Sequence, residues 1–459
     1  MPILFSQELP IYTLLVLLVL PLYYLYSRAS CRSNNPAVLP TNWPILHMLP
    51  SLVANLHNLH DYFTLVLIFT IDGEPARRQR TKIKSVLSSP WLVARMEAGC
   101  RDKVENSLLP LFTHMASTGT PFNVQELMSR FMFDMATIPL FGVDPGLLSW
   151  DMPPMDAAVA MDTIMEVAFF RVMMPSSCWK LMRWLNIGTE RKLQVAHKVL
   201  GEFVREMLER RKINTCRLGN AEEQEGVDIR SCFINDPDYA DDDLAHAMII
   251  SYMLAARDTV GTTLTWVFYN LAKNPSIVSI IRNELSPIAS HKVASGAGAM
   301  LIFEPDETKS LVYLRAVLYE TLRLYPPAPL ERKMVAGNDI MPSGHEVHTG
   351  DTIFISLYSM GRMEGVWGND CLDYNPDRWI VNDGNNLRYV PSHKFLAFNS
   401  GPRMCLGKDI AIMQMKTIIA STLWNFDVQL MEGQSIQPKP SCILEMKNGL
   451  IVKLNKRVI

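Results

Sequence analysis

The run 398–407, Phe-Asn-Ser-Gly-Pro-Arg-Met-Cys-Leu-Gly, is the part of the sequence best suited to chemistry. Glycine and proline make it turn-rich around Cys405, and an apolar helical pattern follows directly. Cys405 is therefore expected in a constrained loop at a helix N-terminus. There the backbone N–H groups and the helix dipole favour an anionic sulfur, the form that binds iron. The alternative is the common role of a lone cysteine in an apolar chain, which is a buried packing residue.

A long apolar run over residues 244–272 predicts one helix that crosses the body of the protein. Three aspartates precede it, and acidic residues are typical of a helix N-terminus. Its middle, residues 255–259, reads Ala-Ala-Arg-Asp-Thr. A charged and hydroxylated step inside a buried helix costs free energy unless those groups have partners or a chemical task. One possible partner is the carbonyl one turn earlier, to which a threonine hydroxyl can donate.

These patterns together resemble the cytochrome P-450 family. The spacing Phe-x-x-Gly-x-Arg-x-Cys-x-Gly in 398–407 resembles its haem-ligand signature, and residues 255–259 resemble its oxygen-activating motif. Glu320 and Arg323 lie three apart on one helical face, which by itself is common on exposed surfaces. With Arg378 in Tyr-Asn-Pro-Asp-Arg-Trp, 374–379, this pair resembles the buried triad of the family, in which two planar guanidinium groups hold one carboxylate.

The resemblance runs from residue 36 nearly to the C-terminus. It implies a mainly helical fold with a smaller β region, behind a single N-terminal membrane anchor. It also implies haem b as the iron cofactor, electrons from NADPH through a partner reductase, and dioxygen and a small lipophilic molecule as substrates. The formal net charge of −2 gives no case for a nucleic-acid partner.

The resemblance assigns roles to individual residues. Cys405 is the implied metal ligand, and Asp258 and Thr259 are the implied catalytic pair that passes protons to dioxygen. Glu320, Arg323 and Arg378 form the implied structural triad. The implied cofactor-binding residues, with Arg403 as the best partner for a haem propionate, are Arg80, Ala255, Arg332, Phe398, Gly401, Arg403 and Gly407.

The sequence departs from the family pattern at the substrate side of the haem. Ala256 stands where glycine is usual, Val260 replaces a second threonine, and Ala76 replaces a tryptophan four residues before Arg80. Only about two dozen residues separate Pro50 from the helix predicted to open at Pro75 and run to about residue 87. Most of the interval that relatives fill with strands, a helix and a pocket loop is therefore expected to be missing.

Several motifs look like the plant branch that hydroxylates fatty acids and wax alkanes, closest to the mid-chain alkane hydroxylases. Among them are Trp-Gly-Asn-Asp-Cys-Leu, 367–372, and Ala-Arg-Asp-Thr, 256–259. Two alternatives stay open: an enzyme that couples phenols oxidatively in alkaloid synthesis, and a truncated, catalytically inactive membrane-bound member. A Met-rich stretch over residues 152–174 agrees with a lipid substrate, although filling a core is the commoner use of methionine.

The N-terminus reads as a membrane anchor. Residues 11–26 are uncharged, Glu8 precedes them, and Arg28 and Arg32 follow. This charge order favours an uncleaved anchor over a cleavable signal peptide, with the catalytic body on the cytosolic side. The family resemblance implies that the membrane is that of the endoplasmic reticulum. The predicted organisation is an anchor over 1–27, a proline-rich hinge and shortened segment over 28–72, and a haem-binding monooxygenase domain over 73–459.

Two small β regions are predicted near the C-terminal half. Short β-prone segments around Ile340, Val347 and residues 353–357 indicate a small sheet. The pattern over 442–458, with Asn448 and Gly449 at a turn, predicts a hairpin of two strands. Eight cysteines without a Cys-x-x-Cys pair indicate neither a zinc site nor a disulfide framework, and favour a reducing compartment.

Overall fold

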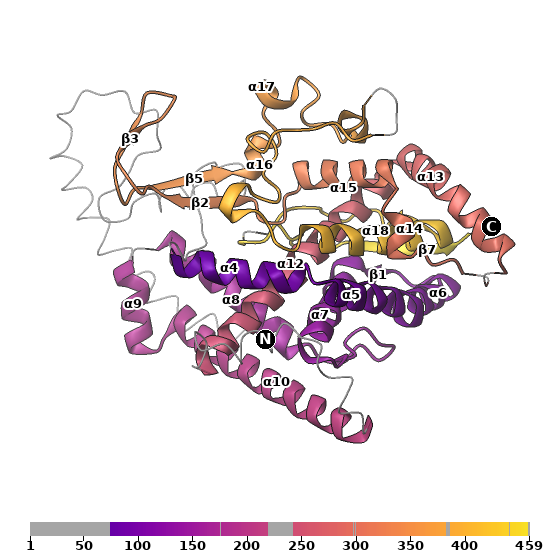
Figure 1. The fold of residues 1–459 in the computed structure, drawn as a ribbon, viewed down its shortest axis with the longest axis horizontal. Coiled ribbons are helices and arrows are strands. Elements are labelled where there is room, and N and C mark those ends of the chain that lie inside the picture. The colour runs from indigo at the N-terminus through magenta and orange to yellow at the C-terminus, as the bar shows by residue number, and fades with distance from the viewer. Residues whose placement is uncertain are drawn as a thin grey trace. The chain divides into compact units, whose positions relative to one another are not determined.

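The computed structural model describes residues 74–174, 176–218, 242–296, 298, 300–381, 386–439 and 441–457, all within one compact unit. This part of the chain is mostly helical, with short strands beside the helices (Figure 1). The predicted anchor, 1–27, and the hinge and shortened segment, 28–72, lie outside the described residues. Among the described helices, none combines the length and the apolar character needed to cross a membrane.

The described α-helices are α4 (Glu74–Leu87), α5 (Pro90–Lys103), α6 (Leu109–Thr118), α7 (Val124–Phe141), α8 (Asp156–Met173), α9 (Ser176–Leu185), α10 (Gly188–Leu218), α12 (Asp242–Lys273), α13 (Pro275–Ala294), α14 (Pro305–Thr308), α15 (Val312–Leu324), α16 (Leu357–Met360), α17 (Glu364–Trp367) and α18 (Lys408–Asn425). A π-helical turn, Val104–Leu108, joins α5 to α6. Two 3-10 turns are η5 (Pro376–Trp379) and η6 (Gly401–Arg403).

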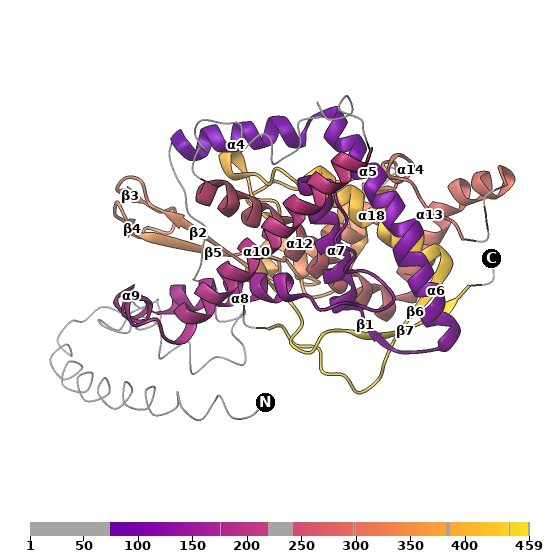
Figure 2. The same ribbon diagram turned by 90° about the horizontal axis from the view of Figure 1, so that it is seen from below.

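The long helix α12 is the predicted central helix, and it lies in the middle of the helical body beside α7 (Figure 2). The two helices pack closely at Gly261, where an added Cβ would be in ordinary van der Waals contact with the carbonyl oxygen of Met128 at 3.6 Å. The buried hydroxyls of Thr263 and Thr265 donate to carbonyls one turn earlier, at 2.7 and 2.9 Å. These two hydroxyls are therefore satisfied within the helix, as a buried position requires.

Two apolar clusters surround α12. The larger one joins α6, α7, α12, α13, α15 and α18, and the smaller one joins α8 and α10 to the ends of α5 and α7. Met161 is buried in the smaller cluster, and Met165 of α8 is buried as well. The interpretation of methionine as core filling is confirmed for these two residues, so they give no support to a lipid substrate.

The strands form three small antiparallel sheets. β1 (Phe122–Asn123), β7 (Ile451–Lys456) and β6 (Phe426–Leu430) pair in that order, β2 (Leu330–Met334) pairs with β5 (Thr352–Ser356), and β3 (Asp339–Ile340) pairs with β4 (Glu346–Val347). The strands predicted around Ile340, Val347 and residues 353–357 are confirmed, but they belong to two separate two-stranded sheets, and Leu357 begins α16. The predicted C-terminal hairpin is wrong in its first strand: β7 pairs with β6, and residues near 446 make a single bridge to Pro438. Alternation within 442–458 could not reveal a partner that precedes it in the chain.

Gly361, at the end of α16, packs against the backbone of α15, and this contact can be tested by its effect on stability. A Cβ at this position would lie 2.0 Å from the backbone oxygen of Arg323, and backbone atoms of a buried helix cannot move aside cheaply. We expect Gly361→Ala to lower the free energy of unfolding by roughly 1–3 kcal/mol or more through overpacking. Gly365→Ala is the matched control, because a Cβ there meets no atom within 4 Å. Equal urea-unfolding midpoints for the two variants would contradict this packing.

Candidate active site

Cys405 lies in a tight loop that ends at the N-terminus of α18. Its backbone N–H donates to the carbonyl oxygen of Phe398 at 2.7 Å, and the N–H of Ala411 donates to the carbonyl oxygen of Gly407 at 2.8 Å as the helix begins. Gly401 has a left-handed φ of 58°, which glycine adopts without strain. Cys405 itself is exposed. A ligand needs this accessibility, whereas a packing residue does not.

The electrostatics of Cys405 differ from the sequence prediction in one respect. The pKa of the Cys405 thiol is raised, and desolvation is the largest cause, although the residue as a whole is exposed. The Gly407 N–H and the positive charges of Arg80 and Lys408 all act in the opposite direction. The predicted contribution of the helix N-terminus is therefore present, but it does not by itself make the sulfur anionic. Binding to a metal cation would supply the remaining stabilisation.

Neighbouring elements hold the Cys405 loop from two sides. On α4, the Arg80 guanidinium donates to the carbonyl oxygen of Met404. On the other side, the Asn399 amide donates to the Glu331 carboxylate of β2 at 2.6 Å. Residues far apart in the sequence therefore fix the loop.

The three arginines predicted to bind the cofactor do not all meet. Arg80 and Arg403 lie close enough that, after burial, the charge of Arg403 is the next cause of the lowered pKa of Arg80. Arg332 lies on β2 beside Glu331 and donates to the Thr352 hydroxyl at 3.3 Å. The guanidinium groups of Arg80 and Arg403 therefore lie near Cys405, whereas that of Arg332 bonds to Thr352 on the neighbouring strand β5.

The side chains of Asp258 and Thr259 on α12 lie in different surroundings. Thr259 donates to the carbonyl oxygen of Ala255 at 2.7 Å, which is the one-turn bond weighed from the sequence. Ala255 is exposed and Thr259 half-buried, so both lie on an accessible face of the helix. Asp258 is buried and pairs at 2.9 Å with its neighbour Arg257. The acid and the alcohol are therefore adjacent in sequence without being bonded to each other in this structure.

Arg257 connects this step to other helices, which the sequence did not reveal. Its guanidinium pairs with Asp162 of α8 at 2.7 Å and donates to the Ser129 hydroxyl of α7 at 2.6 Å. One turn along α8, Glu166 pairs with Lys439 at 2.8 Å. Two acids four apart in an apolar helix, Asp162 and Glu166, gave only a weak signal, because the side chains are 39% and 48% exposed and burial does not force them to have partners.

This network changes the titration of Asp258. Burial is the largest cause that raises the pKa of the carboxyl to about 7, Arg257 opposes it, and the nearby carboxylates of Asp162 and Glu445 add to the rise. Burial and the charge of Asp162 also raise the pKa of Glu445. A carboxyl that titrates near neutral pH can both release and accept a proton, as an acid–base group must.

Glu320, Arg323 and Arg378 meet in the structure. The Glu320 carboxylate is completely buried and accepts from Arg323 at 2.7 and 2.8 Å and from Arg378 at 3.0 Å. It also accepts from the Trp379 indole and the Asn375 backbone N–H, both at 2.8 Å. These last two partners were not predicted.

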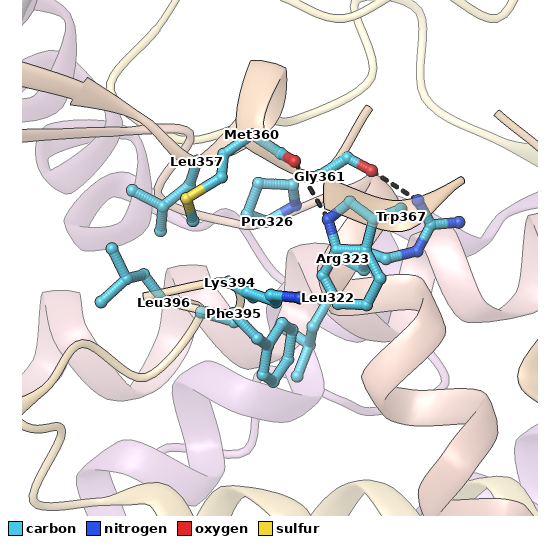
Figure 3. Close-up of a pocket in the computed structure, with 11 residues that line it drawn as sticks. Leu322, Arg323, Pro326, Leu357, Met360, Gly361, Trp367, Lys394, Phe395 and Leu396 are labelled. Carbon is cyan, nitrogen blue, oxygen red and sulfur yellow. Dashed lines mark hydrogen bonds between the residues drawn. The ribbon is translucent and has the colours of Figure 1, made fainter. Parts of the chain in front are cut away.

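Beside this triad lies a small surface pocket, with an empty volume of about 200 Å³ that includes open solvent (Figure 3). The Trp367 indole donates to the carbonyl oxygen of Met360 at 3.0 Å, and Arg323 donates to that of Gly361 at its wall. Lys394 and Leu396 also line it. None of the residues predicted to hold the cofactor lines this pocket.

Comparison with known proteins decides the family: a sequence model described as Cytochrome P-450 matches residues 53–454. The chain belongs to the cytochrome P-450 family. It is 31% identical over 488 aligned positions to noroxomaritidine synthase 1 of Narcissus pseudonarcissus, covering 94% of each chain. It is 34% identical to the alkane hydroxylase MAH1 of Arabidopsis thaliana, covering 85% of this P-450 and 77% of the relative. Identity to cytochrome P-450 86B1 of the same plant is also 34%, over 85% and 71%.

The comparison with the Narcissus relative also bears on length. Its 488 aligned positions exceed the 459 residues of this P-450, which therefore lacks residues that the relative has. The family is one of haem monooxygenases, so this chain is a P-450 monooxygenase whose cofactor is haem iron.

The residues of this P-450 fit a haem. The exposed Cys405 sulfur has one backbone N–H and two positive side chains beside it. Gly401 and Gly407 leave open space on the loop, because a Cβ at either would meet no heavy atom within 4 Å. A flat cofactor needs this combination of one accessible sulfur and a loop surface free of side chains.

The triad gives the P-450 body a test of its buried charges. We expect Arg323→Ala to lower the free energy of unfolding by about 3–5 kcal/mol, because it leaves the buried Glu320 carboxylate short of a partner. Arg101→Ala removes an exposed pair with Asp102 and should leave unfolding nearly unchanged. Urea titration measures both. An Arg323→Ala protein as stable as the control would contradict the role of the triad.

The raised pKa of Asp258 predicts a pH dependence of stability. Between its ordinary value of 3.8 and about 7, folded P-450 holds a proton that the unfolded chain releases. Stability from this group therefore falls as the pH rises through that window, by at most about 1.4 kcal/mol per unit. We expect wild type to lose stability relative to Asp258→Asn between pH 4 and 7, and the difference to be constant above it. A difference independent of pH would contradict the raised pKa.

Proposed function

We propose that this P-450 binds haem b at Cys405 and hydroxylates long-chain alkanes or fatty acids, with dioxygen and electrons from NADPH through a partner reductase. The observation that carries the proposal is the exposed Cys405 thiol in a loop fixed by the Phe398 carbonyl, α4 and β2. A thiolate-ligated haem supplies reductive activation of dioxygen.

The residues around Cys405 would hold the cofactor. Arg403 and Arg80 are the proposed partners of the haem propionates, and guanidinium groups suit carboxylates because they bind them in bidentate fashion. Arg332 is a third candidate on β2, the strand that also bonds to Asn399 of the loop. Phe398, Gly401 and Gly407 shape the loop itself, and Ala255 lies on the accessible face of α12.

Thr259 and Asp258 are the proposed proton-handling pair. The Thr259 hydroxyl holds a proton on the accessible face of α12, where it donates to Ala255. Asp258 lies behind it in a network of Arg257, Asp162 and Glu445, and its pKa of about 7 suits proton exchange at neutral pH. Arg257 pairs with Asp258 and lowers the pKa of its carboxyl, so in this proposal Arg257 favours release of the proton that burial retains.

The substrate proposal rests on the resemblance to fatty-acid and alkane hydroxylases and on the similarity to a relative named as an alkane hydroxylase. A second candidate is oxidative coupling of phenols in alkaloid synthesis. It is favoured by the similarity to noroxomaritidine synthase 1, which extends over 94% of both chains. A third candidate, a truncated inactive member, is favoured by the residues that this chain lacks in that alignment.

We further propose that the protein is attached to the endoplasmic reticulum membrane by residues 1–27, with its body on the cytosolic face. The apolar run 11–26 and the charges that flank it support the anchor. The amphipathic helix α9 adds support, because Trp184 is 80% exposed beside the exposed Leu181 and Leu185. Tryptophan is enriched where proteins meet the membrane surface.

Product analysis tests the substrate. Microsomes that contain the full chain and its reductase would be supplied with NADPH and, in separate reactions, a long-chain alkane, a long-chain fatty acid and a phenolic amine. We expect hydroxylated alkane or fatty acid and no coupled phenol, because the motifs of the chain follow the hydroxylase branch. Coupled phenol as the only product would replace the proposal with the second candidate, and no product in a haem-loaded preparation would favour the third.

A further inference from the structure

A continuous series of aromatic rings leads away from the Cys405 loop. The ring of Phe398 lies 6.4 Å from that of Tyr319 between centroids, and Tyr319 lies 5.4 Å from Trp379. Trp379 in turn lies 5.5 Å from Trp367. At these separations neighbouring rings are packed against one another. The series begins at a residue whose carbonyl accepts the Cys405 N–H.

The series ends at the surface. Trp379 is 1% exposed, whereas Trp367 is partly exposed and lines the small pocket of Figure 3 together with Lys394 and Leu396. The rings therefore continue from the ligand loop to a partly exposed side chain. A dissolved molecule can therefore reach one end of a ring series whose other end adjoins Cys405.

The two tryptophans have different charged neighbours. Trp379 donates its indole N–H to the completely buried Glu320 carboxylate at 2.8 Å, and the guanidinium groups of Arg323 and Arg378 bind the same carboxylate. The guanidinium of Arg323 lies 5.2 Å from the ring of Trp367 and opposes a positive charge there. Tryptophan and tyrosine are the side chains that give up single electrons most readily.

We propose that Tyr319, Trp379 and Trp367 form a one-electron route that protects the site when an oxidant forms there without a substrate to consume it. This rests on the proposed haem at Cys405. With haem bound, Trp379 would lose one electron through the packed rings to the oxidant there, while its N–H stays bonded to Glu320. A dissolved one-electron donor of the ascorbate class then supplies an electron through Trp367 and restores the neutral indole.

Trp367→Phe tests the route, because phenylalanine keeps an aromatic ring but does not give up an electron readily. Haem-loaded full-length protein would be mixed with hydrogen peroxide without substrate, with and without ascorbate, and frozen at intervals for electron paramagnetic resonance. We expect a tryptophan radical in both proteins. Ascorbate should clear it severalfold more slowly in Trp367→Phe, and the haem absorbance of that variant should be lost severalfold faster.

Trp150→Phe is the matched control, since Trp150 is exposed and lies outside the series. It should behave as wild type. Equal clearance and bleaching in wild type and Trp367→Phe, or no tryptophan radical in wild type, would overturn the route while leaving the haem proposal intact. A preparation with no haem absorbance would instead contradict the proposed haem site.

Discussion

The buried carboxylate of Glu320 is the interaction on which the rest of this structure depends. A charge removed from water is tolerated only when its partners satisfy it, and here two guanidinium groups, an indole and a backbone N–H do so. Arg323 also donates to the carbonyls of Gly361, Cys371 and Asp373. One ion pair thereby fixes α15 against the long segment that leads to the Cys405 loop. Tyr319, one residue before Glu320, packs against Phe395 and Phe398 and carries that constraint to the loop.

A second constraint acts on α12. The hydroxyls of Thr259, Thr263 and Thr265 donate to carbonyls within the helix. Arg257 and Asp258 cannot be satisfied in that way, and they draw in Asp162 of α8 and Ser129 of α7. The network holds more acids than bases, and this imbalance, with burial, keeps the pKa of Asp258 high. Packing and proton chemistry therefore have the same cause at this position.

The sequence predicted features whose determinants are local. The helix from Pro75 to about residue 87, the helix over 244–272 and the loop around Cys405 follow from caps, apolar runs and turn residues within a few positions of each site. It also brought Glu320, Arg323 and Arg378 together through resemblance. Features set by distant partners were missed: the pairing of β7 with β6, the contact of Arg257 with Asp162, and the bond of Trp379 to Glu320. The raised pKa of Cys405 was missed for the same reason, because desolvation depends on all the surrounding protein.

The central claim is that this P-450 forms a haem site at Cys405 although it lacks residues present in a relative. The most direct measurement is the carbon monoxide difference spectrum of the reduced full-length protein in microsomes. The claim predicts the red-shifted Soret band of a thiolate-ligated haem in wild type and in Cys178→Ser, a cysteine of α9 that is not in the loop. It predicts loss of that band in Cys405→Ser. Wild-type protein without the band, or Cys405→Ser protein that retains it, would contradict the account.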